Sequence, residues 1–478
     1  MDILTVVWIT LPFFVGFLIY LLPTLDRFLA MGVALVSLAY GLWQLIEPSS
    51  VTLSLLDSFG VTLTVDVLSG YFILTNALVT TAVLLYCWGS NKTAFFYTQA
   101  IVLHGSINAV FICADFISLY VALEVIGIAA FLLITYPRSD RSIWLGLRYL
   151  FVSNVAMLFY LVGVAMVYQM NHSFAFAGLR NAPAEATTLI FLGLLTKGGV
   201  FISGLWTPLT NAESETAISA LLSGVVEKAG VFPLIRLALL LDQINPIVRF
   251  FAVASALMGV TWAILEKDTK RTLAFSTISQ LGWVMAAPAV GGVYALAHGL
   301  AKPAIFLAVG HLPSRDFKEL QKQRIDTTLW MILLIGGLSI AGFPLLAGFG
   351  AKILTMQNLV PWQTVLMDIA AIGTVIVYAK FVFLPHQKQK MRDSLQPGFW
   401  AAIALLIGGL LVANGVYYPA YTVANITKAI ALVGIGWLIY HLMIRRISLQ
   451  LPRMFEQLEH LIGMMSVMLV LLFWMVWA

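Results

Sequence analysis

Six ionisable side chains lie inside long apolar segments of this chain. These residues are Glu124, Lys197, Lys228, His298, Lys302 and Lys352. A lysine at the centre of a membrane helix costs about 2.5–3.5 kcal/mol on insertion scales, so such residues usually face a partner or a water-filled cavity. Amines, imidazoles and carboxylates can all take up and release protons. The types of these residues and their positions inside apolar segments therefore indicate a proton relay.

The spacing of these residues restricts which of them can meet. His298 and Lys302 are four residues apart, which places them on one face of a helix. Lys228 directly follows Glu227, and adjacent helix positions point about 100° apart, so the two cannot face the same neighbour. The sequence leaves open which of the two faces the proton axis. We choose Lys228 for the interior and expect Glu227 at an interface or lipid edge.

Glu124 is the single carboxylate of its span, and Lys197 is its expected partner. Two interpretations remain open. The pair could be a structural ion pair that lets two helices pack, or Glu124 could be a proton-linked carboxylate. The second is favoured because an ionisable residue inside a membrane is a functional hypothesis by default. Weaker candidates, most of them nearer to span ends where long side chains reach the interface, are His104, Arg148, Arg236, Asp368 and Lys380.

The composition indicates an all-α polytopic membrane protein. Hydrophobic residues make up 61% of the 478 residues and charged residues only 10%. Apolar runs long enough to cross about 30 Å of hydrocarbon recur from end to end, which excludes the short alternating strands of a membrane barrel. The formal net charge is +5. Because the basic residues lie in short loops between spans, we exclude nucleic acid as a partner.

The sequence carries no motif of a cofactor site, a metal site or an enzyme active site. Cys87 and Cys113 lie near the ends of apolar runs and support neither a disulfide framework nor a metal site. The stretch GFGAKI at 348–353 lacks the first-glycine spacing of a phosphate loop and the Ser or Thr after its lysine. We therefore expect no cofactor, no metal ion and no catalysis by this chain.

Apolar segments define up to sixteen candidate spans, and we expect fourteen to sixteen membrane helices. The segments are 3–23, 28–46, 68–88, 94–113, 116–136, 147–168, 187–206, 216–240, 248–266, 272–288, 292–311, 329–358, 363–385, 399–417, 422–443 and 459–477. The first is interpreted as a span because it lacks the basic leading region and cleavage site of a signal peptide. Breaks are expected in span 7, where two glycines follow Lys197, and in span 12, where Gly342 and Pro344 precede Lys352.

The similar positions of these two lysines suggest two structural repeats, spans 4–8 and spans 9–13. Each repeat has five spans, an odd number, so the second must enter the membrane from the opposite side. Inverted repeats with interrupted helices are typical of transporters. The expected divisions are 1–93 for spans 1–3, 94–240 for the first repeat, 248–385 for the second and 399–477 for the C-terminal spans.

The distribution of Lys and Arg predicts the orientation. One set of alternate loops holds most of these residues, from Arg27 to Arg453, whereas the other holds little beyond Arg180. Because positively charged loops are retained in the cytoplasm, both termini are predicted on the non-cytoplasmic side. We expect a multi-pass protein of the cell inner membrane or another energy-transducing membrane.

Segments around the six residues resemble the antiporter-like membrane subunits shared by Mrp-type Na+/H+ antiporters (the D/A-type subunit), complex I and membrane-bound hydrogenases. The resemblance covers about residues 60–390. It rests on ADFISLYVALEVIG, LLTKGGVF, ETAISALLSGVVEKAGVF, EKDTKRTLAFSTISQLGW, AHGLAKPAIFLAVGH and AGFPLLAGFGAK.

This resemblance implies a role for each of the six residues. By analogy with the family, they are the ion pair of a first half-channel (Glu124 and Lys197), a central relay (Lys228 and His298, extended by Lys302) and the terminal lysine of a second half-channel (Lys352). The implied partners are other membrane subunits of the same assembly, protons and a monovalent cation.

The leading hypothesis is a proton-translocating subunit of an Mrp-type cation (Na+)/proton antiporter. The loop GLWTPLTNAESE lacks the His before the Trp and the Asp-Ala-His after the Pro that many members have, and this departure favours the Mrp-like branch. The alternative is a proton-pumping, non-redox subunit of a complex I-like oxidoreductase or a membrane-bound hydrogenase. A third hypothesis is a structural membrane scaffold with inert ion pairs. The first two describe an ion-translocating membrane subunit and not an enzyme.

Overall fold

The computed structural model describes residues 2–56, 60–388, 395–446 and 453–477. Within these ranges, thirteen helices are long and apolar enough to cross a membrane, or fourteen if one bent pair counts as a single span. This confirms the prediction of an all-α polytopic membrane protein. The span count of thirteen or fourteen lies just below or at the lower end of the expected range.

The N-terminal part contains three long helices and one hairpin. Its elements are α1 (Asp2–Leu21), α2 (Asp26–Ile46), β1 (Val51–Leu56), β2 (Gly60–Val65) and α3 (Val67–Cys87). The strands pair antiparallel with Val51 opposite Val65, so the connection predicted between spans 2 and 3 is a short ribbon. Asp66 follows the ribbon, and its carboxylate accepts a hydrogen bond from the Ser69 backbone amide, which caps α3.

The next group of helices carries three of the six candidate residues. Its elements are α4 (Ala94–Ile112), α5 (Phe116–Ile134), α6 (Asp140–Asn171), α7 (Ala184–Lys197), α8 (Thr207–Glu213), α9 (Thr216–Leu221), the π-helical turn η4 (Leu222–Val226) and α10 (Glu227–Leu240). The segments Ala184–Lys197 and Phe201–Glu213 are bent by 41° relative to each other. Gly199 lies at this bend with φ +66°, a conformation that glycine adopts without steric cost. The bend fits the break predicted for span 7.

The remaining elements surround α13 and extend to the C-terminus. They are α11 (Asn245–Leu265), α12 (Thr269–Ala286), α13 (Gly291–Val309), α14 (Phe317–Leu320), β3 (Ile325–Asp326), α15 (Thr327–Ala341), α16 (Ala347–Gln357), α17 (Pro361–Val382), β4 (His386–Gln387), α18 (Pro397–Ala413), α19 (Val423–Leu442) and α20 (Leu458–Trp477). The two short strands β3 and β4 pair in parallel.

Two of the sixteen predicted spans are not among the helices that are both long and apolar enough to cross a membrane. The first corresponds to α12, which has many polar residues, but every one of its residues is buried, so its polar side chains face protein. The second is divided between α15 and α16, which are separated by the five residues 342–346. Each of these two helices is shorter than a full span.

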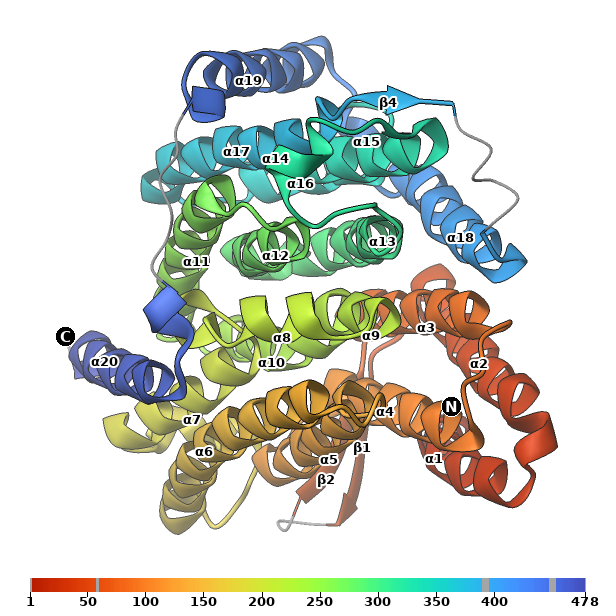
Figure 1. Cartoon of the computed structure of the whole chain (residues 1–478). Coiled ribbons are helices and arrows are strands. Elements are labelled where there is room, and N and C mark those ends of the chain that lie inside the picture. Colours follow the sequence, from red (N-terminus) through yellow and green to blue (C-terminus); the bar gives the residue numbers. More distant parts are fainter. Residues whose placement is uncertain (1, 57–59, 389–394, 447–452, 478) are drawn as a thin grey trace.

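The centre of the molecule is formed by helices that lipid does not reach. Figure 1 shows α12 and α13 between a group containing α15, α16 and α17 and a group containing α8, α9 and α10. Farther out lie α4 to α7 on one side and α19 on the other. The last helix, α20, packs on α7 and not on its sequence neighbour α19. Charged residues on the central helices are therefore surrounded by protein.

Candidate functional site

Lys197 is the last residue of α7 and is buried. Its ammonium group donates a hydrogen bond to Ser153 Oγ of α6 at 2.5 Å. Glu124 on α5 interacts electrostatically with Lys197, but no ion pair joins the two among the described residues, and Glu124 Oε1 has no hydrogen-bond partner there. The expected partners thus lie near each other, with Ser153 holding the lysine.

A close backbone contact brings α7 against α10 at the level of these charges. A Cβ atom added to Gly230 would lie 2.2 Å from the backbone nitrogen of Gly198 and 2.8 Å from the carbonyl carbon of Lys197. Only glycine permits this approach. The contact sets the separation between the end of α7 and the start of α10, where Lys228 lies.

Glu227 and Lys228 are both completely buried. Glu227 accepts a hydrogen bond from the Asn211 side chain of α8 at 2.8 Å. The expectation that Glu227 lies at an interface or lipid edge is therefore wrong. Adjacent positions do point in different directions, but α10 is enclosed by other helices on both of these sides.

Lys228 contacts His298 of α13 across the centre of the molecule. The Lys228 Nζ atom lies 3.1 Å from His298 Nδ1. It also donates hydrogen bonds to the carbonyl oxygens of Ser223 at 3.3 Å and Gly224 at 2.5 Å. Both carbonyls belong to the π-helical turn η4, whose wider winding leaves carbonyl oxygens available to a side chain. His298 Nε2 has no hydrogen-bond partner within the described ranges, so one ring nitrogen is free to exchange a proton.

Lys302 lies one helical turn beyond His298 on α13 and turns toward α12 and α17. It donates hydrogen bonds to the carbonyl oxygen of Leu273 at 2.8 Å and to the Tyr378 hydroxyl at 2.9 Å. The Tyr378 hydroxyl also lies 3.1 Å from Ser276 Oγ. Two hydroxyl groups, the first on α17 and the second on α12, therefore continue the contacts of Lys302.

Lys352 on α16 binds the end of α15. Its ammonium group donates hydrogen bonds to the carbonyl oxygens of Ile340 and Ala341, each at 3.2 Å. These are among the last carbonyls of α15, which lack partners within their own helix and carry partial negative charge. The same ammonium group lies 4.7 Å from the centre of the Trp283 ring, within cation–π range.

The six candidate residues thus occupy the core, and one pair is in direct contact. Glu124, on α5, is half-buried, and the other five are buried. Lys228 and His298 meet directly. Glu124 and Lys197 lie near each other without an ion pair, and Lys302 and Lys352 are held by different helices.

The side chains that hold the lysines were not predicted from the sequence. Ser153, Tyr378 and Trp283 were not among the candidate residues, although each binds or covers one of the lysines. A hydroxyl or aromatic residue in an apolar span is too common to signal a contact by itself. The π-helical turn carries no sequence signal that we recognise.

Two of the weaker candidates are held by structural contacts. His104 is buried, with Nε2 2.9 Å from Ser37 Oγ and Nδ1 3.0 Å from Thr80 Oγ1, so it joins α4 to α2 and α3. Lys380 of α17 donates to carbonyl oxygens at the end of α11, including that of Ala263 at 3.2 Å. A lysine that caps a helix in this way needs no transport role.

Two arginines among the weaker candidates anchor segments near the ends of helices. Arg236 forms an ion pair with Asp66 at the start of α3. Burial opposes ionisation of Asp66, but the hydrogen bonds and charge of Arg236 outweigh it, so the pKa of Asp66 lies below its ordinary value. Arg148 donates to the carbonyl oxygen of Glu456 at 2.6 Å, just before α20 begins.

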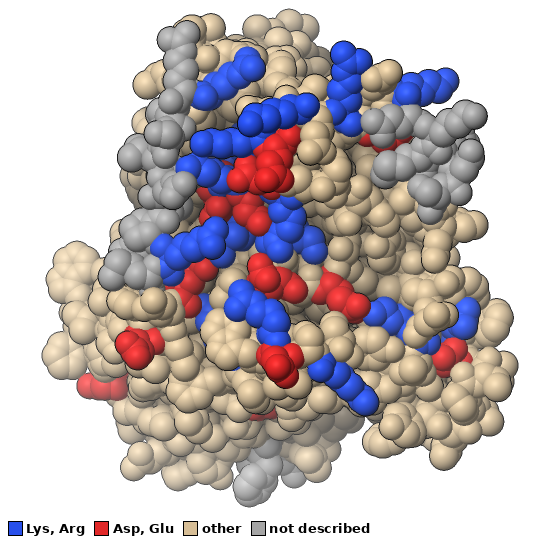
Figure 2. Space-filling view, viewed as in Figure 1, with Lys and Arg blue, Asp and Glu red and all other residues tan. Residues whose placement is uncertain are grey.

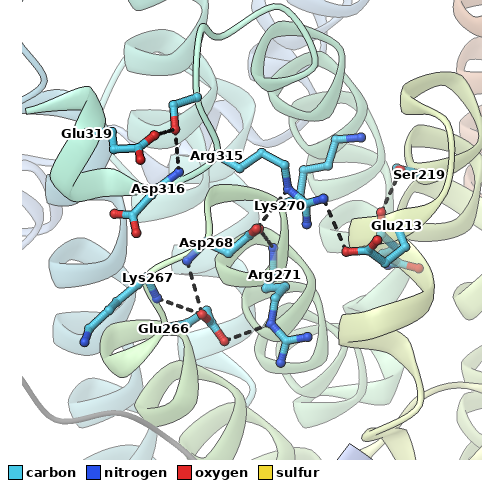
Figure 3. Close-up of polar contacts among 12 residues, drawn as sticks. Glu213, Ser219, Glu266, Lys267, Asp268, Lys270, Arg271, Arg315, Asp316 and Glu319 are labelled. Atoms are coloured by element: carbon cyan, nitrogen blue, oxygen red, sulfur yellow. Dashed lines mark hydrogen bonds and ion pairs between the residues drawn. The ribbon is translucent and has the colours of Figure 1, made fainter. Parts of the chain in front are cut away.

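Charged side chains gather on one face, over the loops next to α8, α12 and α14 (Figure 2). Figure 3 shows the contacts in this cluster. Arg315 forms ion pairs with Glu213 at 3.3 Å and with Asp268 at 2.8 Å. Glu266 forms an ion pair with Arg271 at 3.0 Å. The cluster connects the loops at the ends of α8, α11 and α13.

Glu266 in this cluster is held in its ionised form. Burial raises its pKa, but the charge of Arg271 and the backbone amides of Lys267 and Asp268 act in the opposite direction and together outweigh burial. The pKa of Glu266 therefore lies below its ordinary value of 4.5. This carboxylate stabilises the folded loop only while it is ionised.

The described residues contain no group of three or more His, Cys, Asp or Glu side chains that could hold a metal ion. Cys87 and Cys113 are both buried and free. The polar atoms of the core are thus arranged as separate lysine, histidine and hydroxyl contacts.

Comparisons with known proteins identify relatives of this chain. The family described as "NADH:quinone oxidoreductase/Mrp antiporter, TM" matches residues 113–377. The chain is 26% identical to a D-type subunit of a Na+/H+ antiporter from Alkalihalophilus pseudofirmus, over 74% of this chain and 80% of the relative. It is also 26% identical to an NAD(P)H-quinone oxidoreductase chain 4-2 from Synechocystis sp., over 77% of this chain and 75% of the relative.

A solved structure has the same fold. A chain of the Mrp complex from Dietzia sp. DQ12-45-1b superposes with a TM-score of 0.74 at 17% identity, covering 95% of this chain and 98% of that chain. The likeness extends over nearly the whole length of both chains.

Proposed function

Because the chain belongs to the NADH:quinone oxidoreductase/Mrp antiporter membrane family, we propose that it is the proton-translocating subunit of an Mrp-type cation (Na+)/proton antiporter. The observation that carries this proposal is the contact between Lys228 and His298. Two groups that can each bind a proton meet at 3.1 Å between α10 and α13, completely shielded from solvent. At this distance the two groups can pass a proton directly from one to the other.

The proton path runs along the candidate residues in order. Lys197 at the end of α7 passes a proton toward Lys228, and Lys228 exchanges it with His298. His298 is followed by Lys302 one turn later on the same helix, and Lys352 on α16 is the terminal group. Steps without a direct contact are completed by water, since a bridging water replaces a direct hydrogen bond at little cost.

Glu124 and Glu227 supply negative charge at the first half of this path. Glu124 acts on Lys197, and Glu227 acts on both Lys228 and Lys302. A change in the position or protonation of either carboxylate alters how strongly a neighbouring lysine holds its proton. We infer that this coupling drives the transfer between successive lysines, within two inverted repeats at 94–240 and 248–385.

The antiporter assignment is supported by the Na+/H+ antiporter relative and by the sequence of residues 204–215. This segment was expected to be a loop but contains α8, and its sequence departs from the fuller pattern of the family that the chain resembles. The alternative is a proton-pumping, non-redox subunit of a complex I-like oxidoreductase or hydrogenase. The equal identity to the quinone oxidoreductase chain favours that alternative as the second candidate. In both cases the chain translocates ions and is not itself an enzyme.

The proposal also specifies the surroundings of the chain. Its partners are other membrane subunits of the same assembly, with protons and a monovalent cation as the transported ions. The chain lies in the cell inner membrane or another energy-transducing membrane, with both termini on the non-cytoplasmic side as the loop charges predict.

The test is cation-dependent dissipation of a pH gradient in vesicles from an antiporter-deficient host. The host expresses the complete set of subunits, with either the wild-type chain or Lys228→Ala, and assembly is checked by co-purification. Sodium-dependent dissipation that disappears in the assembled variant supports antiport through the relay. An assembled wild-type complex with no cation response, or with co-purified iron–sulfur or flavin subunits, favours the redox-driven alternative. Full transport by Lys228→Ala leaves only a scaffold role for these residues.

A further inference from the structure

A cavity of about 210 Å³ lies beside Lys352. Its walls come from α12, α15, α16, α17 and α19, and they include Trp283, Asp368 and Lys428 in addition to Lys352. This volume is large enough for several water molecules, and the charged and aromatic side chains offer them partners. The cavity therefore places two further charged side chains, within a largely apolar lining, next to the terminal lysine of the relay.

Asp368 and Lys428 form an ion pair in this cavity. Asp368 Oδ1 of α17 lies 3.1 Å from Lys428 Nζ of α19. At 1.5 Å rise per residue, Asp368 lies about 10 Å along α17 from its first residue and Lys428 about 8 Å along α19 from its first residue. Both helices have the length and apolar composition of membrane spans, so both charges are placed where they cost free energy.

Exposure increases along the cavity. Lys352 is 6% exposed, whereas the side chains of Asp368 and Lys428 are 31% and 47% exposed. The cavity thus leads from a buried amine to a carboxylate at its accessible end. Lys352 itself is bound by backbone carbonyls, and the acidic group whose charge acts on it is Asp368.

We propose that Asp368 and Lys428 form the outlet for protons that leave Lys352, an inference that rests on the proposed function. A proton leaves Lys352 through water in the cavity and is taken up by the Asp368 carboxylate. One N–H bond of the ammonium group breaks and one O–H bond forms, which leaves a neutral amine and a neutral acid. Release follows on the side where α16 ends and α17 begins.

Lys428 has a defined part in this outlet. Its ammonium group lies 3.1 Å from Asp368 Oδ1 and holds that carboxylate at the accessible end of the cavity. Lys428 lies outside residues 113–377, the region that the family description matches. The helix α19 thus contributes a functional side chain from the C-terminal spans.

A purely structural role makes a different prediction. If the ion pair only fastens α19 to α17, replacing it with two apolar residues of similar size should preserve both assembly and transport, because such replacements often maintain stability. If Asp368 accepts protons, the same replacement should preserve assembly but slow transport. The double variant Asp368→Leu with Lys428→Leu therefore separates the two roles.

The experiment measures proton flux by the complete assembly in vesicles. The variants are Asp368→Asn, Lys428→Gln and the double leucine variant. The matched control is Lys92→Gln, which breaks the 2.7 Å ion pair with Glu215 on a loop. We expect Asp368→Asn to lose about tenfold or more in rate, less than the ~10²–10⁴ of a direct proton-transfer group because water can partly replace it. The double leucine variant should assemble and be equally slow, Lys428→Gln should be slowed, and the control should match wild type.

Two results overturn the outlet. The first is a wild-type rate in assembled Asp368→Asn, and the second is a wild-type rate in the double leucine variant. Lys228→Ala, measured in parallel, identifies which proposal has failed. If Lys228→Ala abolishes flux while Asp368→Asn does not, only the outlet is wrong. If Lys228→Ala is itself without effect, the relay of the proposed function is wrong.

Discussion

Replacing Gly230 with alanine should push α7 and α10 apart. The added Cβ atom would lie 2.2 Å from the backbone nitrogen of Gly198, whereas ordinary contact begins at 3.4 Å. The difference between these distances, about 1.2 Å, must be met by a shift of two backbones, because no flexible side chain lies at the contact. Such overpacking typically costs about 1–3 kcal/mol.

The shift should also reduce transport. Lys228 lies two residues before Gly230, and Lys197 directly precedes Gly198, so the contact controls the separation of the two lysines. We expect Gly230→Ala to unfold at a lower temperature in detergent and to translocate protons more slowly in vesicles. A displacement of about 1 Å is enough to lose much of the benefit of precise positioning.

Gly408 on α18 provides the matched control. A Cβ atom added there would meet no atom within 4 Å. Gly408→Ala should leave transport unchanged. It should raise the free energy of unfolding by about 0.5–1 kcal/mol, because alanine is more favourable than glycine in a helix interior. Equal stability and equal flux in the two variants would refute the contribution of the α7–α10 contact.

Three further outcomes are expected. Because the pKa of Glu266 is lowered in the folded chain, its contribution to stability is complete above about pH 4.5 and is lost as the pH falls through the pKa of the folded state. Thermal unfolding measured from pH 7 to pH 3 should therefore show a smaller loss of stability at acid pH in Glu266→Gln than in wild type. Asn211→Leu removes the donor from the buried Glu227 carboxylate and should cost about 1.5–3 kcal/mol, read by thermal unfolding against Asn211→Gln. Tyr378→Phe removes the hydroxyl that binds Lys302 but keeps the ring, so it should cost about 0.5–1.5 kcal/mol and slow proton flux, whereas unchanged flux would remove the hydroxyl from the path.

The positions of the helices could be predicted because each long apolar run has one stable form in a membrane. The span predicted at 272–288 is also present, as α12 (Thr269–Ala286), although this helix carries many polar residues. This helix is buried on all sides by protein, a property of the assembled bundle that hydropathy along the chain does not report.

The candidate residues could be predicted because an ionisable group inside a membrane span costs free energy and is therefore seldom incidental. Their contacts could not be predicted. Lys228 and His298 are 70 residues apart, and only the packing of α10 against the neighbours of α13 brings them to 3.1 Å. The environment of Glu227 was predicted wrongly. Helical geometry shows that Glu227 and Lys228 point in different directions, but it does not show which helices pack against each of them. Asn211 supplies that missing neighbour from α8.

The lysines of this core are held largely by the main chain. Lys228, Lys302 and Lys352 all donate hydrogen bonds to carbonyl oxygens, which every residue type supplies. Residues that provide these carbonyl oxygens can therefore be substituted during evolution without loss of the hydrogen bonds to the lysines, provided that the backbone of each helix stays in place. Over the matched region this chain differs from the Na+/H+ antiporter relative at about three positions in four, and hydrogen bonds to carbonyl oxygens do not depend on the side chains at the positions that supply them.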